Sequence, residues 1–462
     1  MLIVERTEAD LIAEQLPEPL LDRGRLHDML STLARKYQVP GAQLAIHHGG
    51  EKVAIEVGEL RYGTGRSVTQ DTAFPIGSIT KAFTATLAMI LVADGDIDLD
   101  APLSEHLPEL RDLGDELNLR QLLSHTSGFA NEPGNEVRAT SIRRYVLDHC
   151  SRQNLVLPPG TGFSYSNIGY VLVGHLIETV TGMSWWEAME SCLLRPLGIE
   201  PTFIGAPEHR PLATGHSVNI AAGRTRPVEQ SIVPAEAPAG ALAMSALDLV
   251  ALGLTQLDSA LLPATYAQQM REAVPLAEPW GMADGWGLGL AVFGTGNTAW
   301  VGHFGGLIGT ACDVRLDPVS GCIVAFTSNA NSGGMWHELI DELRRAGLPI
   351  RDCSNTEVRG RPTVPPPGCA GSYLNGKAEW TISVTETGTL CLAVDGDVIA
   401  EFTCFEDLRF SAPAQPKIRG RFLRDPTNGD INRIQVGLCV ALRESAISEN
   451  RQYLYGAAAV GA

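Results

Sequence analysis

The segment from Ser78 to Asp96, SITKAFTATLAMILVADGD, decides how this chain can fold, because it is apolar on nearly every side. A helix of that kind is expected at the centre of a domain. Ser78 and Lys81 stand three residues apart at its start, so a helix places both side chains on one face. A hydroxyl beside a partly desolvated amine is one way to build a nucleophile. The other interpretation is an ordinary helix start, with Ser78 as N-cap and Lys81 reaching water.

Two short motifs elsewhere in the chain favour the first interpretation. The segment GTGFSYSNIGY contains Tyr165–Asn167 in a glycine-rich loop, and VGHFGGLIG contains His303–Gly306. Each motif is weak alone, because Tyr373–Asn375 and His48–Gly50 fit the same patterns. Of the five lysines, however, only Lys81 has a serine three residues before it. Only one combination therefore gives all three motifs within one domain.

The elements expected around these motifs predict a mixed α/β (α+β) domain. Helical spacing over residues 20–41 is followed by two strands around a His-Gly-Gly turn in residues 42–60. Strand-like runs later in the chain occupy residues 285–294, 298–306, 310–318 and 322–330. A last helix is expected over residues 335–347. Strands from both ends with helices between them predict an antiparallel sheet that is flanked by helices and closed by both ends of the domain.

A change of composition predicts a second domain. Residues 354–367 include three consecutive prolines, which favour an extended linker. Beyond them, short alternating runs separated by turn residues predict a small all-β barrel. The expected organisation is therefore a catalytic domain over residues 1–353, a linker over 354–367 and a barrel over 368–462.

Charge and cysteine content limit the partners and the compartment. The formal net charge of −18 argues against nucleic acid as a partner. The first twenty residues lack the pattern of an export signal, and no run approaches the roughly 18 apolar residues that span a membrane. Nine scattered cysteines without a C-x-x-C pair indicate neither a disulfide framework nor a metal site. We expect a cytoplasmic protein with reduced thiols, no membrane association and no metal.

Taken in order, the three motifs resemble those of the serine β-lactamase and penicillin-binding protein superfamily, in which S-x-x-K carries the nucleophile. The segment RQLLSHTSGF, Arg120–Phe129, also looks like a connecting segment of that family. The resemblance covers roughly residues 25 to 350. It implies a β-lactamase/transpeptidase-like domain and a serine acyltransferase or hydrolase.

The chemistry of such a site assigns a role to each residue. Ser78 at a helix N-terminus lies near backbone N–H groups and a positive dipole end, which favour developing negative charge. Burial should lower the pKa of Lys81, so that it can accept the serine proton. Tyr165 can relay a proton, and Asn167 would hold a substrate carbonyl. By resemblance, the oxyanion hole is formed by the backbone N–H groups of Ser78 and Gly306.

The third motif departs from the pattern of many β-lactamases. His303 stands where those enzymes have lysine, and Phe304 replaces a small hydroxyl residue. A β-lactam carboxylate would lose its ammonium partner there, which counts against β-lactamase activity. His303 and Phe304 remain candidate site residues.

A narrower resemblance comes from two long segments. Residues 162–201 and 283–303 look like the stand-alone penicillin-binding-protein-type thioesterases, or peptide cyclases, of actinobacterial nonribosomal peptide pathways. That family implies a lipocalin-like C-terminal domain. It also implies that Ser78 takes a peptide from the phosphopantetheine thioester of a peptidyl carrier protein, and that the peptide's own amine then releases it as a head-to-tail lactam. No cofactor of the enzyme itself is implied, and the peptide's last residue is implied to be a D-residue.

Two alternatives stay open. The first is a cytoplasmic esterase or D-amino-acid peptidase of the same fold, which differs only in the second nucleophile. The second is a catalytically silent ligand-binding protein. Loss of Ser78, Lys81 or Tyr165 would mark the silent protein, and all three are present.

Overall fold

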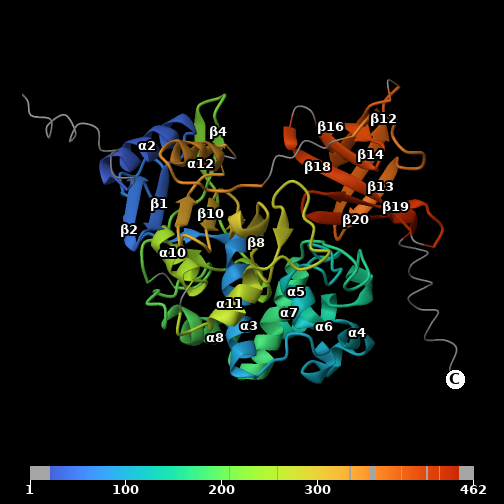
Figure 1. The fold of residues 1–462 in the computed structure, drawn as a ribbon, viewed down its shortest axis with the longest axis horizontal. Helices are drawn as coiled ribbons and strands as arrows, with labels where there is room; N and C mark the ends of the chain where they lie inside the picture. Colours follow the sequence, from blue (N-terminus) through green and yellow to red (C-terminus); the bar gives the residue numbers. More distant parts are fainter. Residues whose placement is uncertain are drawn as a thin grey trace, which may run out of the picture.

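Two domains make up the structure, which is a computed structural model (Figure 1). It describes residues 21–207, 209–257, 259–331, 334–353, 360–386, 388–412, 415–425 and 427–446. The expectation of no export signal concerns residues 1–20, which lie outside the described residues. So do residues 354–359 of the expected linker and the last residues of the expected barrel domain, 447–462.

A seven-stranded antiparallel sheet forms one half of the first domain, in the order β2-β1-β11-β10-β9-β8-β7. Its strands are β1 Gly41–His48, β2 Glu51–Gly58, β7 Gly285–Trp286, β8 Ala291–Phe293, β9 Trp300–Gly305, β10 Ala311–Leu316 and β11 Ile323–Ser328. Gly49 and Gly50 turn β1 into β2 with positive φ values. β1 then pairs with β11, where Ala42 stands opposite Ser328. The predicted closure of the sheet by both ends of the domain is therefore confirmed.

Helices cover both faces of this sheet. α2 (Arg23–Lys36) and α12 (Met335–Arg345) pack on one face, where Leu30 and Leu339 share a core with Phe326 of β11. α10 (Ala246–Thr255) packs on the other face and starts with a capping box of Ser245 and Asp248.

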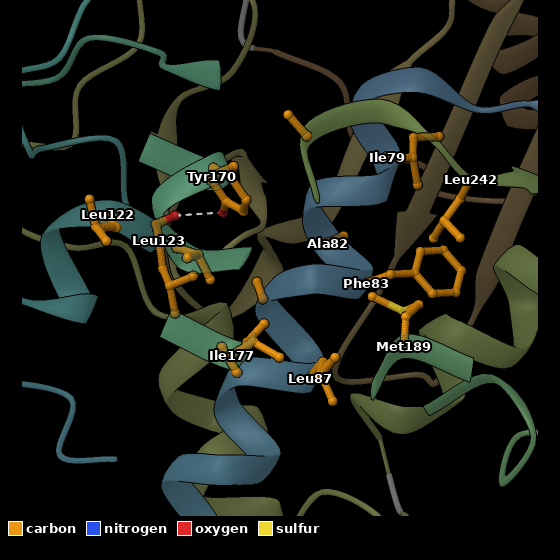
Figure 2. Packing of buried hydrophobic residues seen from close by; sticks show 14 of the residues in the cluster. Ile79, Ala82, Phe83, Leu87, Leu122, Leu123, Tyr170, Ile177, Met189 and Leu242 are labelled. Carbon is orange, nitrogen blue, oxygen red and sulfur yellow. Dashed lines mark hydrogen bonds between the residues drawn. The ribbon is translucent and has the colours of Figure 1, made fainter. Parts of the chain in front are cut away.

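The remaining helices form the second half of the domain around α3 (Thr80–Asp94), which runs through its centre (Figure 1). They are α4 Asp112–Glu116, α5 Leu119–Leu123, α6 Ile142–His149, α7 Asn167–Thr181, α8 Trp185–Met189, α9 Ala237–Gly240 and α11 Ala264–Arg271. Figure 2 shows Tyr170 and Ile177 on one side of α3, with Phe83, Met189 and Leu242 on the other. Tyr170 also donates a hydrogen bond to the carbonyl of Leu123 at 3.0 Å.

The length of this central helix corrects one expectation. Among the described residues, Gly77–Asp94 reaches 18 residues with a mean hydropathy of 1.2, enough to cross a membrane by length and composition alone. The prediction that no run approaches this length was wrong. Burial explains the apolar composition, because 78% of the segment lies inside the fold.

The C-terminal domain is a closed, lipocalin-like β-barrel. Eight antiparallel strands follow the order β16-β15-β14-β13-β20-β19-β18-β17, and pairing of β17 with β16 closes the barrel. They are β13 Gly371–Asn375, β14 Ala378–Val384, β15 Leu390–Val394, β16 Asp397–Phe405, β17 Arg409–Ala412, β18 Gln415–Arg424, β19 Ile431–Val436 and β20 Cys439–Arg443. Tyr373, Phe402 and Phe410 lie in its core.

The expected domain boundaries stay predictions, with one difference. A short strand, β12 (Pro362–Thr363), lies inside the expected linker and pairs with β16. Proline at an edge strand keeps the extended backbone without needing to donate a ladder hydrogen bond. The barrel sheet therefore begins before residue 368.

All nine cysteines lie within the described residues, and all are free. No disulfide joins any two of them in this structure. Burial raises the pKa of several of these thiols, Cys150 and Cys312 among them.

Candidate active site

Ser78 lies in a single 3-10 turn, Gly77–Ile79, immediately before α3. The N-cap of α3 is Ile79, and no side chain caps the helix there. A Cβ placed on Gly77 would lie 2.7 Å from Gly306 N, and Gly77 has a φ of +49°. This turn therefore lies against the end of β9. Because Ile79 is the N-cap, the interpretation of Ser78 as N-cap is wrong.

Lys81 does not reach water, because its side chain is fully buried. Its Nζ donates to Ser78 Oγ at 3.3 Å and to the carbonyl of Ala239 at 2.9 Å. Burial lowers the pKa of Lys81 to about 7, while the charges of Glu236 and Glu132 oppose that shift. At neutral pH much of Lys81 is a neutral amine beside the serine hydroxyl, as a general base requires.

Tyr165 joins Ser78 and Lys81 from the loop before α7. The centre of its ring lies 5.0 Å from Lys81 Nζ. Burial raises the pKa of Tyr165, and a hydrogen bond with Ser78 opposes the rise. Tyr165 is therefore a protonated phenol at neutral pH, able to donate or relay a proton. The expected grouping of these three side chains is present, and their catalytic roles stay predictions.

Asn167 is the first residue of α7, two residues beyond Tyr165. Its backbone N–H donates to the carbonyl of Asn131 at 2.9 Å. Ser166 fixes this helix start, because its hydroxyl accepts from Gly169 N–H at 3.0 Å and donates to the carbonyl of Ala130 at 2.7 Å. The predicted contact of the Asn167 amide with a substrate carbonyl stays a prediction.

His303 is completely buried on β9. Its Nδ1 lies 2.7 Å from the carbonyl oxygen of Phe304, and its ring packs edge-on against Trp286 at 5.4 Å. Burial and then the charge of Lys81 lower the pKa of His303 to about 3. The imidazole is therefore neutral and supplies no positive charge in place of a lysine.

The two glycines after Phe304 let β9 approach the serine closely. A Cβ on Gly305 would lie 2.8 Å from Ser78 N and 2.7 Å from Ile79 N. A Cβ on Gly306 would lie 2.3 Å from the carbonyl oxygen of Thr310. Only glycine fits at either place. Gly306 N itself lies against the turn that carries Ser78, since a Cβ on Gly77 would lie 2.7 Å from it. The predicted oxyanion hole of the Ser78 and Gly306 N–H groups stays a prediction.

His125, in the segment Arg120–Phe129, was not among the predicted site residues. His125 is buried with a φ of +59°, and its ring lies 4.2 Å from that of Tyr165. Its Nδ1 accepts a hydrogen bond from Ser166 N–H at 3.1 Å. Burial, and then the charges of Lys81 and His303, keep the pKa of His125 low. A neutral His125 thus holds the Tyr165 loop in place.

The barrel also reaches the site, through backbone atoms. The turn between β19 and β20 offers the carbonyl of Leu438, which accepts a hydrogen bond from Tyr165 N–H at 2.8 Å. In β20, Val440 N–H donates a hydrogen bond to Ser164 Oγ at 3.4 Å. Leu438 and Cys439 pack against the cluster that contains Tyr165 and Trp286. The barrel is therefore part of the support of the site.

A second contact fixes the barrel near the same place. Asn375 Oδ1 accepts from Asn131 N–H at 3.0 Å, and Lys377 Nζ lies 2.9 Å from Glu132 Oε2. Gly376, between them, leaves no room for a side chain, since a Cβ there would lie 1.9 Å from the carbonyl oxygen of Glu132. The turn between β13 and β14 is therefore seated directly on the catalytic domain.

Comparison with known proteins agrees with this arrangement. A family model described as Beta-lactamase matches residues 13–347. Penicillin-binding protein 4 of Amycolatopsis lactamdurans is 30% identical over 375 residues, covering 76% of this chain and 97% of that protein. The crystal structure of SurE matches with a TM-score of 0.81 and 39% identity, over 91% of this chain and 98% of that one. The D-amino acid amidase of Ochrobactrum anthropi SV3 matches with a TM-score of 0.59 and 26% identity, over 70% of this chain and 97% of that one.

Proposed function

The chain belongs to the beta-lactamase family, and we propose that it is a trans-acting thioesterase that releases nonribosomal peptides as macrolactams. The observation that carries this proposal is the likeness to SurE, which extends over 91% of the chain and so includes the barrel. The sequence resembles peptide cyclases such as surugamide cyclase in the same two domains. The peptide, a peptidyl carrier protein that delivers it, a C-terminal D-residue and a cytoplasmic location belong to the proposal.

The first half-reaction forms an ester on Ser78. Neutral Lys81 takes the proton of the Ser78 hydroxyl as Oγ attacks the thioester carbonyl. The N–H groups of Ser78 and Gly306 stabilise the resulting oxyanion. The C–S bond then breaks, and the departing thiolate takes up a proton through Lys81 or Tyr165. Lys81 returns to its neutral form, ready for the second step.

The second half-reaction decides between ring and linear acid. The peptide's amine attacks the ester carbonyl, its proton passes to the base, and Ser78 regains its hydroxyl proton as the C–O bond breaks. A tethered amine has a large effective concentration over a competing nucleophile when it is held close to the ester. The barrel reaches Tyr165 through Leu438, and we expect it to help exclude water from this step.

A second candidate is supported by the amidase match. The D-amino acid amidase of Ochrobactrum anthropi SV3 covers 70% of this chain, and its activity needs only water as the second nucleophile. A stand-alone hydrolase of D-residue esters or amides would use Ser78, Lys81 and Tyr165 in the same way. Only the product separates the two candidates.

The experiment is a product analysis on a peptidyl N-acetylcysteamine thioester that ends in a D-residue. Cyclic peptide as the main product from the full chain supports the cyclase, and Ser78→Ala should give none above the uncatalysed reaction. A matched peptide with an acetylated N-terminus cannot form the ring and should be released as linear acid. Linear acid as the sole product of the free-amine peptide would assign the protein to the hydrolases.

A further inference from the structure

A cavity of about 550 Å³ lies beside β9, and apart from Gly306 its lining has no role in the chemistry above. Sites of roughly 300–1,000 Å³ hold small ligands in many proteins. Its lining includes Gly306, Phe304, Asp313, Phe326 and Trp336. Most of this surface is apolar, while Asp313 brings a carboxyl group into it.

Gly305 and Gly306 line this cavity and also lie against the turn that carries Ser78. Phe304 on β9 stands directly opposite Asp313 on β10, so both side chains project from the same face of the sheet. His303 projects from the other face, toward Trp286. Gly305 lies so close to Ser78 that a Cβ added to it would be 2.8 Å from Ser78 N. A peptide esterified on Ser78 can therefore cross Gly306 and place one side chain beyond Phe304.

One wall of the cavity carries charged groups of both signs. Asp313 Oδ1 lies 3.2 Å from Arg315 Nη2, and Asp352 Oδ1 lies 3.7 Å from the same nitrogen. The guanidinium carbon of Arg315 lies 3.7 Å from the centre of the Phe293 ring. Two carboxyl groups thus share one guanidinium, and His337 Nδ1 lies 3.2 Å from Asp352 Oδ2. A second arginine, Arg419 of the barrel, donates to Sγ of the lining residue Cys353 at 3.3 Å.

Aromatic rings surround the approach to Asp313. Phe304 is partly exposed to the cavity, while Phe326 and Trp336 are buried in its wall. Such walls suit an alkyl chain, and aromatic faces also attract cations. An occupant with an aliphatic stem and a positively charged end matches both the walls and Asp313.

We propose that this cavity is a subsite for a cationic side chain of the acyl peptide, with an aliphatic stem against Phe304 and an ammonium group at Asp313. The proposal rests on the proposed function, because a peptidyl ester on Ser78 brings the side chain to the cavity. Lysine and ornithine are side chains of this class. The subsite would select among peptides before either ring closure or hydrolysis takes place.

A set of peptidyl N-acetylcysteamine thioesters tests this directly. Lysine, norleucine or glutamate is placed at each position in turn, and kcat/KM is measured for total release of product. We expect lysine to exceed norleucine by about tenfold at one position, the scale of one charge-assisted hydrogen bond. Equal values for lysine and norleucine at every position, or a preference for glutamate, would overturn the subsite.

The preference should also depend on pH. Burial raises the pKa of Asp313 to about 7, with Arg315 and His337 acting against the rise and Asp352 adding to it. Below this value the carboxyl is neutral and attracts a cation less, so the ratio of lysine to norleucine should fall from about pH 8 to about pH 6. A ratio of lysine to norleucine that stays constant over this range would show that the preference does not depend on the charge of Asp313.

Two variants keep the test independent of folding. Asp313→Asn should reduce the lysine preference to about twofold or less. Ala311→Leu leaves the charges intact but fills part of the cavity, and should also remove the preference. Asp341→Asn, an exposed acid on α12, is the charge-matched control and should change nothing. A full lysine preference in both cavity variants, each folded by its melting temperature, would overturn the proposal.

The outcomes for subsite and function are distinct. If linear acid is the sole product but the lysine preference is intact, the cyclase proposal is overturned and the subsite proposal stands. Cyclic product with no difference between lysine and norleucine would overturn the subsite and keep the cyclase.

Discussion

Gly376 lies in the barrel, yet its substitution by alanine should weaken catalysis in the other domain. Gly376 has a φ of +61°, and a Cβ there would lie 1.9 Å from the backbone carbonyl oxygen of Glu132. To restore an ordinary contact, the two domains must separate by about 1.5 Å at this turn. Backbone atoms on both sides leave no flexible side chain to move aside.

The displacement is transmitted to the catalytic loop through few contacts. The neighbouring Asn375 donates from Nδ2 to the carbonyl of Val440 at 2.7 Å. Val440 lies two residues from Leu438, whose carbonyl accepts from Tyr165 N–H. A misplacement of about 1 Å in a catalytic group can reduce the rate on the order of 100-fold. We expect Gly376→Ala to lower kcat by about tenfold to 100-fold and to raise the fraction of linear product.

Gly396→Ala is the matched control. Gly396 also lies in a tight turn of the barrel with a positive φ, of +90°, but a Cβ there meets nothing within 4 Å. Alanine in this backbone region costs roughly 1–2 kcal/mol of stability at either place. The melting temperatures of both variants should therefore fall, and that of Gly376→Ala should fall further because of its added contact with Glu132. Steady-state release from the peptidyl thioester and the ring-to-acid ratio are then compared. Equal, nearly unchanged kinetics in both folded variants would refute the idea that the barrel positions Tyr165.

Further predictions concern the reacting groups and the barrel as a whole. Ser78→Ala should remove the covalent adduct that an acylating probe leaves on the intact protein by mass spectrometry; the same adduct on the variant would exclude Ser78 as nucleophile. With a Lys81 pKa of about 7, kcat/KM should rise about tenfold for each pH unit below 7 and level off above it, because only the neutral amine accepts the proton. Lys81→Arg should lose nearly as much activity as Lys81→Ala, since guanidinium stays protonated. Lys52→Arg, at an exposed lysine, should keep its activity. A flat pH profile or an active Lys81→Arg variant would show that Lys81 does not act as a neutral base. Deleting residues 366–462 removes the Leu438 carbonyl and should lower turnover and raise the hydrolysed-to-cyclised ratio; a folded truncation with an unchanged ratio would reject the role of the barrel.

The sequence predicts the parts of this site that depend on local spacing. Ser78 and Lys81 are brought together by a single turn of backbone, and apolar residues around α3 require burial of the lysine. The order of helices and strands followed from periodicity and turn residues in the same way. The pairing of β1 with β11 needed only the presence of strands at both ends of the domain.

Contacts made by backbone atoms could not be predicted. The carbonyl of Leu438 supports Tyr165, yet a backbone carbonyl is the same in every residue and leaves no trace in the sequence. His125 acts by packing against Tyr165, and such a contact depends on a fold that brings distant segments together. The strand at Pro362–Thr363 was missed because proline-rich composition suits both a linker and an edge strand.

The most direct test of the central claim is release from Ser78 in water enriched in oxygen-18. The full chain is acylated with the D-residue-terminated peptidyl thioester, and mass spectrometry follows both the acyl-enzyme and the released peptide. Attack by the tethered amine predicts a product lighter than the linear acid by one water and free of the label. A linear acid carrying one oxygen-18, formed as the acyl-enzyme on Ser78 decays, would contradict the claim.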